Sequence, residues 1–459
     1  MSNDPIFETL TPSQFITFTI PNSINHPCYL HTPSIRVAVL DSPVGAAADD
    51  LPKVAAMIVP DQRETDWNFC TESGHVQLLF NSPNLSRLIL IGNDLPPNPE
   101  PSVYIRPPDT DTMDREKLED ELQPLVMALH PKVCFRKGLP EPLFLTYEDD
   151  VLYRVIIARF VGPFVGEFVV EDVEIEINCD SSKKLRRRLR FKRMPNLIQS
   201  QVPLIPDIGD GEFATELTLD SLRKMKHTKF HVDTTVLVQP YLTPMVSGLL
   251  LISSHLNERI QLGFTPRALC LGVGGGALLT FLNSQLGFQV VGVEADDAVL
   301  SAAKQYFGLN NEKSIKLIVG DAIDMIQTNS SQVNFDIFDA KFDVVMVDLD
   351  SSEAGNGNSA PPPEFVQKSV FQSVRLLLHD HGVLIINVVP VDEVFYMKLV
   401  EELKDAFHKV YEIDVGNQDN FVIVATLSPT FSSNDHDNGF LKRLRYVIQG
   451  GYMDSIVEL

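Results

Sequence analysis

Residues 267 to 282 read RALCLGVGGGALLTFL, an apolar stretch, a turn with four glycines in five positions, and a second apolar stretch. This order predicts a β-strand, a tight turn and an α-helix, an arrangement used for nucleotides and nucleoside cofactors. Gly272, Gly274 and Gly276 would let the backbone turn sharply and approach a ligand closely. The turn lacks the Lys-Ser/Thr pair of loops that bind triphosphates, so it favours a nucleoside without a triphosphate.

Strand-like and helix-like segments alternate evenly around this turn. The strand-like segments RALCLG, QVVGVE, IKLIVGD, KFDVVMVD and GVLIINV end at Gly272, Glu294, Asp321, Asp348 and near Asn387. This spacing is typical of successive βαβ units in a parallel sheet with helices on both faces. Residues 408–415 and 420–427 are also strand-like, but the four residues GNQD between them are too few for a crossover helix. These last two strands must therefore be antiparallel.

We accordingly predict two domains. Residues 226–459 should form an α/β domain of the Rossmann-like class I methyltransferase type, in which a parallel sheet ends in an antiparallel hairpin. Residues 1–225 should form an α+β domain, with strands at VAAMIVP and SRLILIG, helices at ESGHVQLLF and at 111–129, and no cluster of residues that suggests chemistry.

The chain carries 38 basic and 61 acidic residues, a net charge of −23. Such a charge repels nucleic acid, so a nucleic-acid partner is not expected. Residues 183–193, KKLRRRLRFKR, run against this trend. Arg188, Arg190 and Lys192 alternate with apolar residues, as do Glu174 and Glu176 upstream. The two segments therefore predict a β-hairpin whose acidic and basic side chains pair on an exposed face. A strip that binds a partner is the alternative interpretation.

Composition also bears on location and metals. No apolar run reaches the roughly 20 residues of a bilayer span, and the start MSNDPIFETL lacks the features of a secretion signal. The five cysteines lie far apart, without the spacing of a zinc site or a disulfide framework. We therefore expect a cytoplasmic protein without a metal site.

Acidic residues close two further strands of the predicted sheet. Glu294 lies 22 residues beyond Gly272, where a carboxylate can accept both hydroxyls of a ribose. Asp321 and Ala322 follow the next strand and suit an adenine amino group and ring edge. A single acidic residue at such a point is often only a helix cap. Three in register at consecutive strand ends, with Asp348 as the third, favour a cofactor site.

The quoted segments also resemble a known family. LCLGVGGGALLTFL, VVGVEADDAVLSAAKQYFGL, FDVVMVDLDSSE, SAPPPEFVQKSV and GVLIINVV are similar to the carboxyl-terminal domain of the eukaryotic elongation factor 1-alpha lysine and N-terminal methyltransferase family, which is related to spermidine synthases. Upstream, VPDQRETDWNFCTESGHVQLL, FVVEDVEIEIN and LRFKRMPNLIQSQ resemble the segment before that domain. The resemblance covers most of the chain from about residue 55.

This resemblance implies methyl transfer from S-adenosylmethionine to a protein amine, with the amino terminus of elongation factor 1-alpha as the acceptor. From their positions at the ends of adjacent strands, Asp348, Asp350 and Asn387 would hold the incoming amine, and residues 351–363 would form a lip over the substrate. The alternative for Asp350 is that it only caps the following loop. Members of the family usually carry a separate amino-terminal methyltransferase domain that modifies a lysine. Residues 1–225 contain no glycine turn after a strand, so that lysine activity is expected to be absent.

A second departure lies before the glycine turn. Relatives tend to place a histidine near the segment VQPYLTPMVSGLLL, where this chain has Tyr241 and Leu242. The difference bears on turnover more than on cofactor binding. Two other functions therefore stay open, a spermidine-synthase-like aminopropyl transferase and a scaffold that binds the cofactor without turnover.

Overall fold

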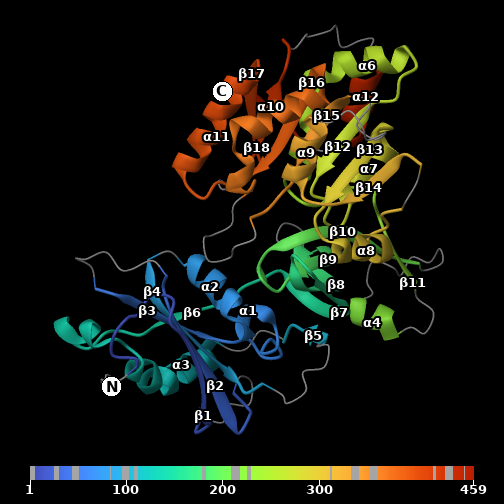
Figure 1. Cartoon of the computed structure of the whole chain (residues 1–459). Helices are drawn as coiled ribbons and strands as arrows, with labels where there is room; N and C mark the ends of the chain where they lie inside the picture. The colour runs from blue at the N-terminus through green and yellow to red at the C-terminus, as the bar shows by residue number, and fades with distance from the viewer. Residues whose placement is uncertain are drawn as a thin grey trace.

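The structure is a computed structural model, which describes residues 6–24, 30–43, 51–82, 84–95, 103–107, 112–177, 182–207, 218–224, 229–310, 313–331, 341–351, 360–416, 420–429, 438–448 and 450–459. The described residues form three sheets. In Figure 1 the amino-terminal sheet is mainly blue, the middle sheet mainly green, and the carboxyl-terminal sheet yellow to red. None of the helices in these ranges has the length and apolar character to cross a bilayer.

The carboxyl-terminal sheet has the order β14-β13-β12-β15-β16-β18-β17-β19. Its strands are β12 (Arg267–Leu271), β13 (Gln289–Glu294), β14 (Ile315–Val319), β15 (Phe342–Val347), β16 (Leu378–Val388), β17 (Lys409–Asp414), β18 (Phe421–Thr426) and β19 (Val457–Glu458). Strands β12 to β16 are parallel, whereas β18 is antiparallel to both β16 and β17. This topology confirms the predicted Rossmann-like methyltransferase fold with its terminal antiparallel hairpin.

Helices cover both faces of this sheet. They are α5 (Leu242–Ser247), η2 (Gly248–Ile252), α6 (Ser253–Gln261), α7 (Ala277–Leu286), α8 (Asp297–Tyr306), α9 (Ala322–Ser331), η4 (Pro363–Phe365), α10 (Lys368–Leu377), α11 (Glu393–Ala406) and α12 (Gly439–Val447). Alternate strand residues face opposite ways. Cys270 and Met346 therefore pack against α5, α7 and α12, while Leu271 and Val347 pack on the side of α9, α10 and α11.

The middle sheet is antiparallel, with the order β11-β10-β9-β8-β7-β5. Its strands are β5 (Val103–Ile105), β7 (Val151–Gly162), β8 (Gly166–Ile177), β9 (Ser182–Phe191), β10 (Ile198–Asp207) and β11 (Lys229–Val232), and α4 (Leu219–Lys224) precedes β11. Phe168 and Leu189 from this sheet share a core with Val299 and Ala302 of α8. The middle sheet is thereby fixed against the carboxyl-terminal sheet and its helices, as Figure 1 shows.

The amino-terminal sheet has the order β1-β2-β4-β3-β6. This sheet and its helices are called the amino-terminal domain, a smaller unit than the predicted residues 1–225. Its elements are β1 (Phe15–Pro21), β2 (Ser34–Asp41), β3 (Lys53–Ile58), α1 (Trp67–Cys70), α2 (Glu72–Phe80), β4 (Leu85–Asn93), α3 (Thr112–Ala128), η1 (Lys132–Lys137) and β6 (Leu143–Leu145). The expected strands at VAAMIVP and SRLILIG and the expected helices at ESGHVQLLF and 111–129 correspond to β3, β4, α2 and α3.

The basic segment lies in β9 and pairs with β8, so the predicted hairpin strands are present; the turn, residues 178–181, lies outside the described ranges. The expected exposed face is wrong. Glu174, Arg188 and Arg190 are 2%, 5% and 7% exposed. Arg190 binds Glu171 rather than Glu174 or Glu176, because Arg190 pairs with Val169 in the strand register and therefore shares a face with Glu171, opposite to the face of Glu174. The face of Arg190 meets Asp66, and the other face packs on α8.

The contact with the amino-terminal domain centres on one buried carboxylate. Asp66 caps α1 and accepts hydrogen bonds from Arg63 at 3.0 Å, from Arg154 of β7 at 2.5 Å and from Arg190 of β9 at 3.2 Å. Burial alone would raise the pKa of Asp66, but these three cations hold it well below its ordinary value. The Asp66 cluster, meaning Asp66 with these arginines, therefore ties the first sheet to the second.

Candidate active site

The glycine turn has the backbone that its sequence predicts. Gly272, Gly274 and Gly276 have φ angles of 86°, 52° and 81°, a region that residues with a side chain rarely adopt. A Cβ on Gly272 would lie 2.0 Å from the carbonyl oxygen of Asp348. No larger residue fits there, so the turn and the end of β15 lie in direct contact.

Glu294, the last residue of β13, binds this turn directly. Its Oε2 accepts hydrogen bonds from the backbone amides of Val273 at 3.1 Å and Gly274 at 3.2 Å. Burial raises the pKa of Glu294, and these amides oppose the rise. A carboxylate thus takes the amide donors that a phosphate would need in a nucleotide-binding loop, so the turn suits a ligand without a phosphate here.

Asp321 and Ala322 lie beyond β14, at the same edge of the sheet. The Oδ1 of Asp321 accepts hydrogen bonds from the amides of Ile323 and Asp324, each at 2.9 Å, so it caps α9. Its side chain is exposed, while Ala322 is buried. The capping role is therefore present, and contact with an adenine ring stays a prediction.

Asp348 follows β15 and holds the centre of the site. Its Oδ1 accepts a hydrogen bond from Asn387 Nδ2 on β16, and its Oδ2 accepts one from the hydroxyl of Tyr241, both at 3.0 Å. Burial raises the pKa of Asp348 to about 6, although these two donors lower it. The carboxylate is thus partnered by neutral donors, and a value near 6 suits a group that takes up a proton at neutral pH.

Asp350 has a different environment from the one the sequence suggested. Arg193 Nη2 lies 3.1 Å from its Oδ2, and Gln199 Nε2 lies 3.5 Å from the same oxygen. Burial raises the pKa of Asp350, and Arg193 opposes that rise. The structure therefore brings Asp348 and Asn387 together as expected but pairs Asp350 with a cation from the middle sheet.

Sequence reasoning missed the residues that the middle sheet supplies. Ser200 of β10 accepts a hydrogen bond from the amide of Gly275 at 2.8 Å. Arg193 and Gln199 come from the same part of the chain, and Tyr241 was noted only as a departure from relatives. The sequence shows Arg193 only as the end of a basic segment. No local pattern in residues 193–200 indicates that this part of the chain contacts the glycine turn or Asp350.

The expected substrate lip, residues 351–363, lies mostly outside the described part of the chain, since residues 352–359 are not described. Its far end does meet the site's strand. Ala360 exchanges two backbone hydrogen bonds with Val389, just beyond Asn387.

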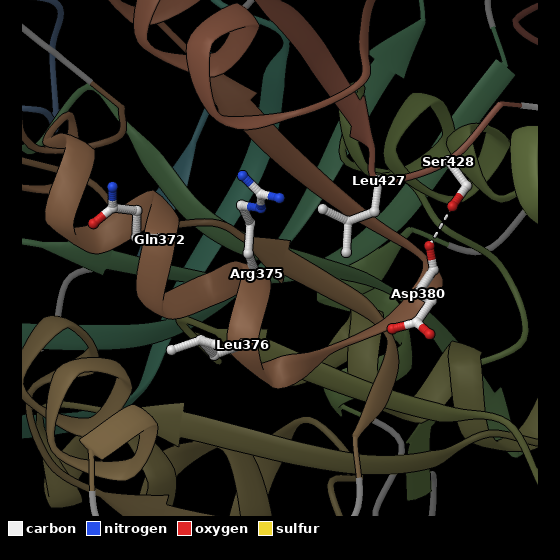
Figure 2. A pocket seen from close by; sticks show the side chains of 6 residues that line it. All are labelled: Gln372, Arg375, Leu376, Asp380, Leu427 and Ser428. Atoms are coloured by element: carbon white, nitrogen blue, oxygen red, sulfur yellow. Dashed lines mark hydrogen bonds between the residues drawn. The ribbon is translucent and has the colours of Figure 1, made fainter.

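A separate hollow of about 500 Å³ lies elsewhere. It is lined by Gln372, Arg375, Leu376, Asp380, Leu427 and Ser428. Figure 2 shows it between α10, the start of β16 and the residue after β18, with Ser428 bonded to the carbonyl of Asp380. Because Thr426 pairs with Val383, this is the opposite end of β16 from Asn387, and the hollow is no part of the candidate site. Among the described residues, no group of three or more His, Cys, Asp or Glu side chains could hold a metal ion.

Comparison with known proteins gives consistent names. No family model matches the chain. Curated proteins called eEF1A lysine and N-terminal methyltransferase match it at 29% identity in Xenopus laevis, 28% in Danio rerio and 27% in Homo sapiens. These matches cover 80%, 86% and 86% of this chain and 50%, 54% and 54% of the relatives. The chain thus spans about half the length of the curated relatives it matches.

Two solved structures are also similar. Human methyltransferase-like protein 13 in complex with SAH is 26% identical, with a TM-score of 0.40, over 47% of this chain and 94% of that one. A probable spermidine synthase from Corynebacterium glutamicum is 14% identical, with a TM-score of 0.42, over 66% and 90%. Over most of its own length, the chain is similar to proteins named eEF1A lysine and N-terminal methyltransferase.

Proposed function

We propose that this chain is an S-adenosylmethionine-dependent protein methyltransferase whose acceptor is the amino terminus of elongation factor 1-alpha. The observation that carries the proposal is the Asp348 carboxylate, held by Tyr241 and Asn387 against the glycine turn. The names of the curated relatives support the reaction and the acceptor protein.

The residues around the glycine turn fit this cofactor. Glu294 and Asp321 offer carboxylates to a ribose and an adenine amino group, and Gly272, Gly274 and Gly276 leave room for close approach. The turn amides are already bonded to Glu294, which disfavours a phosphorylated ligand at that position. When bound, the cofactor would supply an activated methyl group, so the chain mainly needs to place and deprotonate the amine.

The pKa values of the two amines favour an α-amine over a lysine, whichever base accepts the proton. An α-ammonium group has a pKa near 7.7 to 8.0 and a lysine ammonium near 10.4. Proton transfer to a carboxylate with a pKa of about 6 is then uphill by about 2 units for the α-amine and by more than 4 for lysine. The difference of about 2.5 units between the two amines corresponds to about 3.5 kcal/mol. Asp348 would accept the proton while Asn387 and Tyr241 hold its carboxylate in place.

Location and other partners follow from the same proposal. A translation factor as acceptor places the enzyme in the cytoplasm, and the net charge of −23 disfavours nucleic acid as a partner. The same charge suits a cationic acceptor.

The test incubates the wild-type chain and the Asp348→Asn variant with elongation factor 1-alpha that has either a free or an acetylated amino terminus. Mass spectrometry then locates the methyl groups. We expect labelling of the free amino terminus by the wild type alone. Equal labelling of both forms would exclude the α-amine as acceptor. Labelling of small amines would favour aminopropyl-transferase-like chemistry, and S-adenosylmethionine binding without any labelling would favour the scaffold.

A further inference from the structure

An arginine from outside the methyltransferase domain enters the candidate site. Arg193 lies just after β9, and its Nη2 lies 3.4 Å and 3.1 Å from the two oxygens of Asp350. Its guanidinium also lies over the ring of Phe191, with 5.2 Å between the central carbon and the ring centroid. The Arg193 side chain is 20% exposed, so it is positioned by packing as well as by charge.

The amino-terminal domain holds the turn that carries Arg193. Ser73 Oγ of α2 donates to the carbonyl of Lys192 at 2.9 Å, and the side-chain oxygen of Gln77 accepts from the amide of Asn196 at 2.9 Å. These two bonds lie on either side of Arg193 in the sequence. Helix α2 therefore fixes the turn between β9 and β10.

The pairing changes the charge that an incoming amine meets. Asp350 is neutralised by Arg193, and Glu294 is bonded to the backbone of the glycine turn. Asp348 and Glu294 have neutral hydrogen-bond donors only, but the Oε2 of Glu294 is directed at the glycine turn, so Asp348 is the uncompensated carboxylate beside Asn387. Of the neighbouring carboxylates Asp348 and Asp350, only Asp348 then offers an uncompensated negative charge, which matches one ammonium group.

We propose that Arg193 is a specificity-determining residue that restricts the acceptor to an amine with a single positive charge and disfavours diamines and polyamines. The proposal rests on the proposed amine acceptor and narrows its class. A second ammonium group near Asp350 would meet the Arg193 guanidinium and lose the carboxylate that could otherwise bind it.

The experiment compares two ligands that differ by one charge, n-butylamine and 1,4-diaminobutane. Calorimetry measures the affinity of each for the chain in the presence of S-adenosylhomocysteine. In Arg193→Ala and Arg193→Gln we expect the preference for the diamine over the monoamine to rise about tenfold, because Asp350 becomes free. Arg193→Lys keeps the charge and should behave as the wild type.

Lys192→Ala is the matched control, since this neighbouring side chain pairs with Glu167 on the exposed side of the hairpin. It should leave the ligand preference unchanged. Gln77→Ala should raise the preference for the diamine as Arg193→Ala does, but by less. An unchanged preference in Gln77→Ala would show that α2 does not position Arg193. Unchanged affinity for S-adenosylhomocysteine shows that each variant is folded.

An unchanged preference in both Arg193→Ala and Arg193→Gln, or no diamine binding by them, would overturn the inference. A shift in Arg193→Lys equal to that in Arg193→Ala would also overturn it, because the charge would then be irrelevant. These readouts need no methyl transfer. A chain that methylates no protein yet shows the tenfold shift refutes the proposed function alone.

Discussion

Replacing Asp348 by Asn should make the protein more stable and less active. Burial raises the pKa of Asp348 from 3.8 to about 6, so the folded chain holds this proton more tightly than the unfolded chain. The carboxyl therefore contributes most to stability below pH 4, and the contribution is lost as the pH rises to about 6. A shift of about 2 units corresponds to about 3 kcal/mol. The free energy of unfolding of Asp348→Asn should exceed that of the wild type by up to this amount above pH 6 and by almost nothing near pH 4.

Urea unfolding followed by circular dichroism between pH 4 and pH 8 measures the gain. Fluorescence is unsuitable because Trp67, the single tryptophan, lies in α1 of the amino-terminal domain. Asp343→Asn is the matched control at the other end of β15. Asp343 is fully buried and pairs with Arg259 at 2.9 Å, so its loss should cost about 3 to 5 kcal/mol. A variant at position 348 that is less stable than the wild type at pH 7.5, or a difference constant from pH 4 to 8, would refute the reasoning.

Three other changes test separate parts of the structure. Glu294→Ala should weaken S-adenosylmethionine binding by about 1.5 to 3 kcal/mol in calorimetry, and Glu294→Gln by less, because an oxygen remains for the turn amides. Arg190→Ala should cost about 3 to 5 kcal/mol of unfolding free energy, against less than about 1 kcal/mol for the exposed Lys192→Ala. Tyr241→Phe removes a bond that lowers the pKa of Asp348, so the acidic limb of the rate against pH should move above pH 6. An acidic limb at the same pH as in the wild type would show that Tyr241 does not influence the group that titrates.

The parallel strands and their acidic ends could be predicted because the information is local. Apolar runs with even spacing place Gly272, Glu294 and Asp348 at one edge of a sheet, whatever the rest of the chain does. Asn387 follows in the same way, from the end of β16. The contact between Asp348 and Asn387 therefore follows from topology alone.

The other half of the site depends on how two sheets pack, and no periodicity encodes that. Arg193 lies beside Asp350, and Ser200 lies against the glycine turn. Both positions follow from the core that the middle sheet shares with α8. The same packing explains why the hairpin charges were assigned to the wrong face. Alternation of Glu174 with apolar neighbours indicates two faces, but it does not say that both are covered, the face of Glu174 by Leu219 and the face of Arg190 by Asp66.

The Asp66 cluster has a consequence for anyone who divides this chain. A fragment that begins after β6 would retain Arg154, Arg190 and the partner of Arg190, Glu171, but it would lose β5 and the carboxylate shared by the two arginines. Two closely spaced guanidinium groups would repel each other at the base of the hairpin, and a hairpin loosened there carries Arg193 and Ser200 away from the glycine turn. A protease cut between the first two sheets should therefore impair acceptor selection, although every residue of the methyltransferase fold is still present.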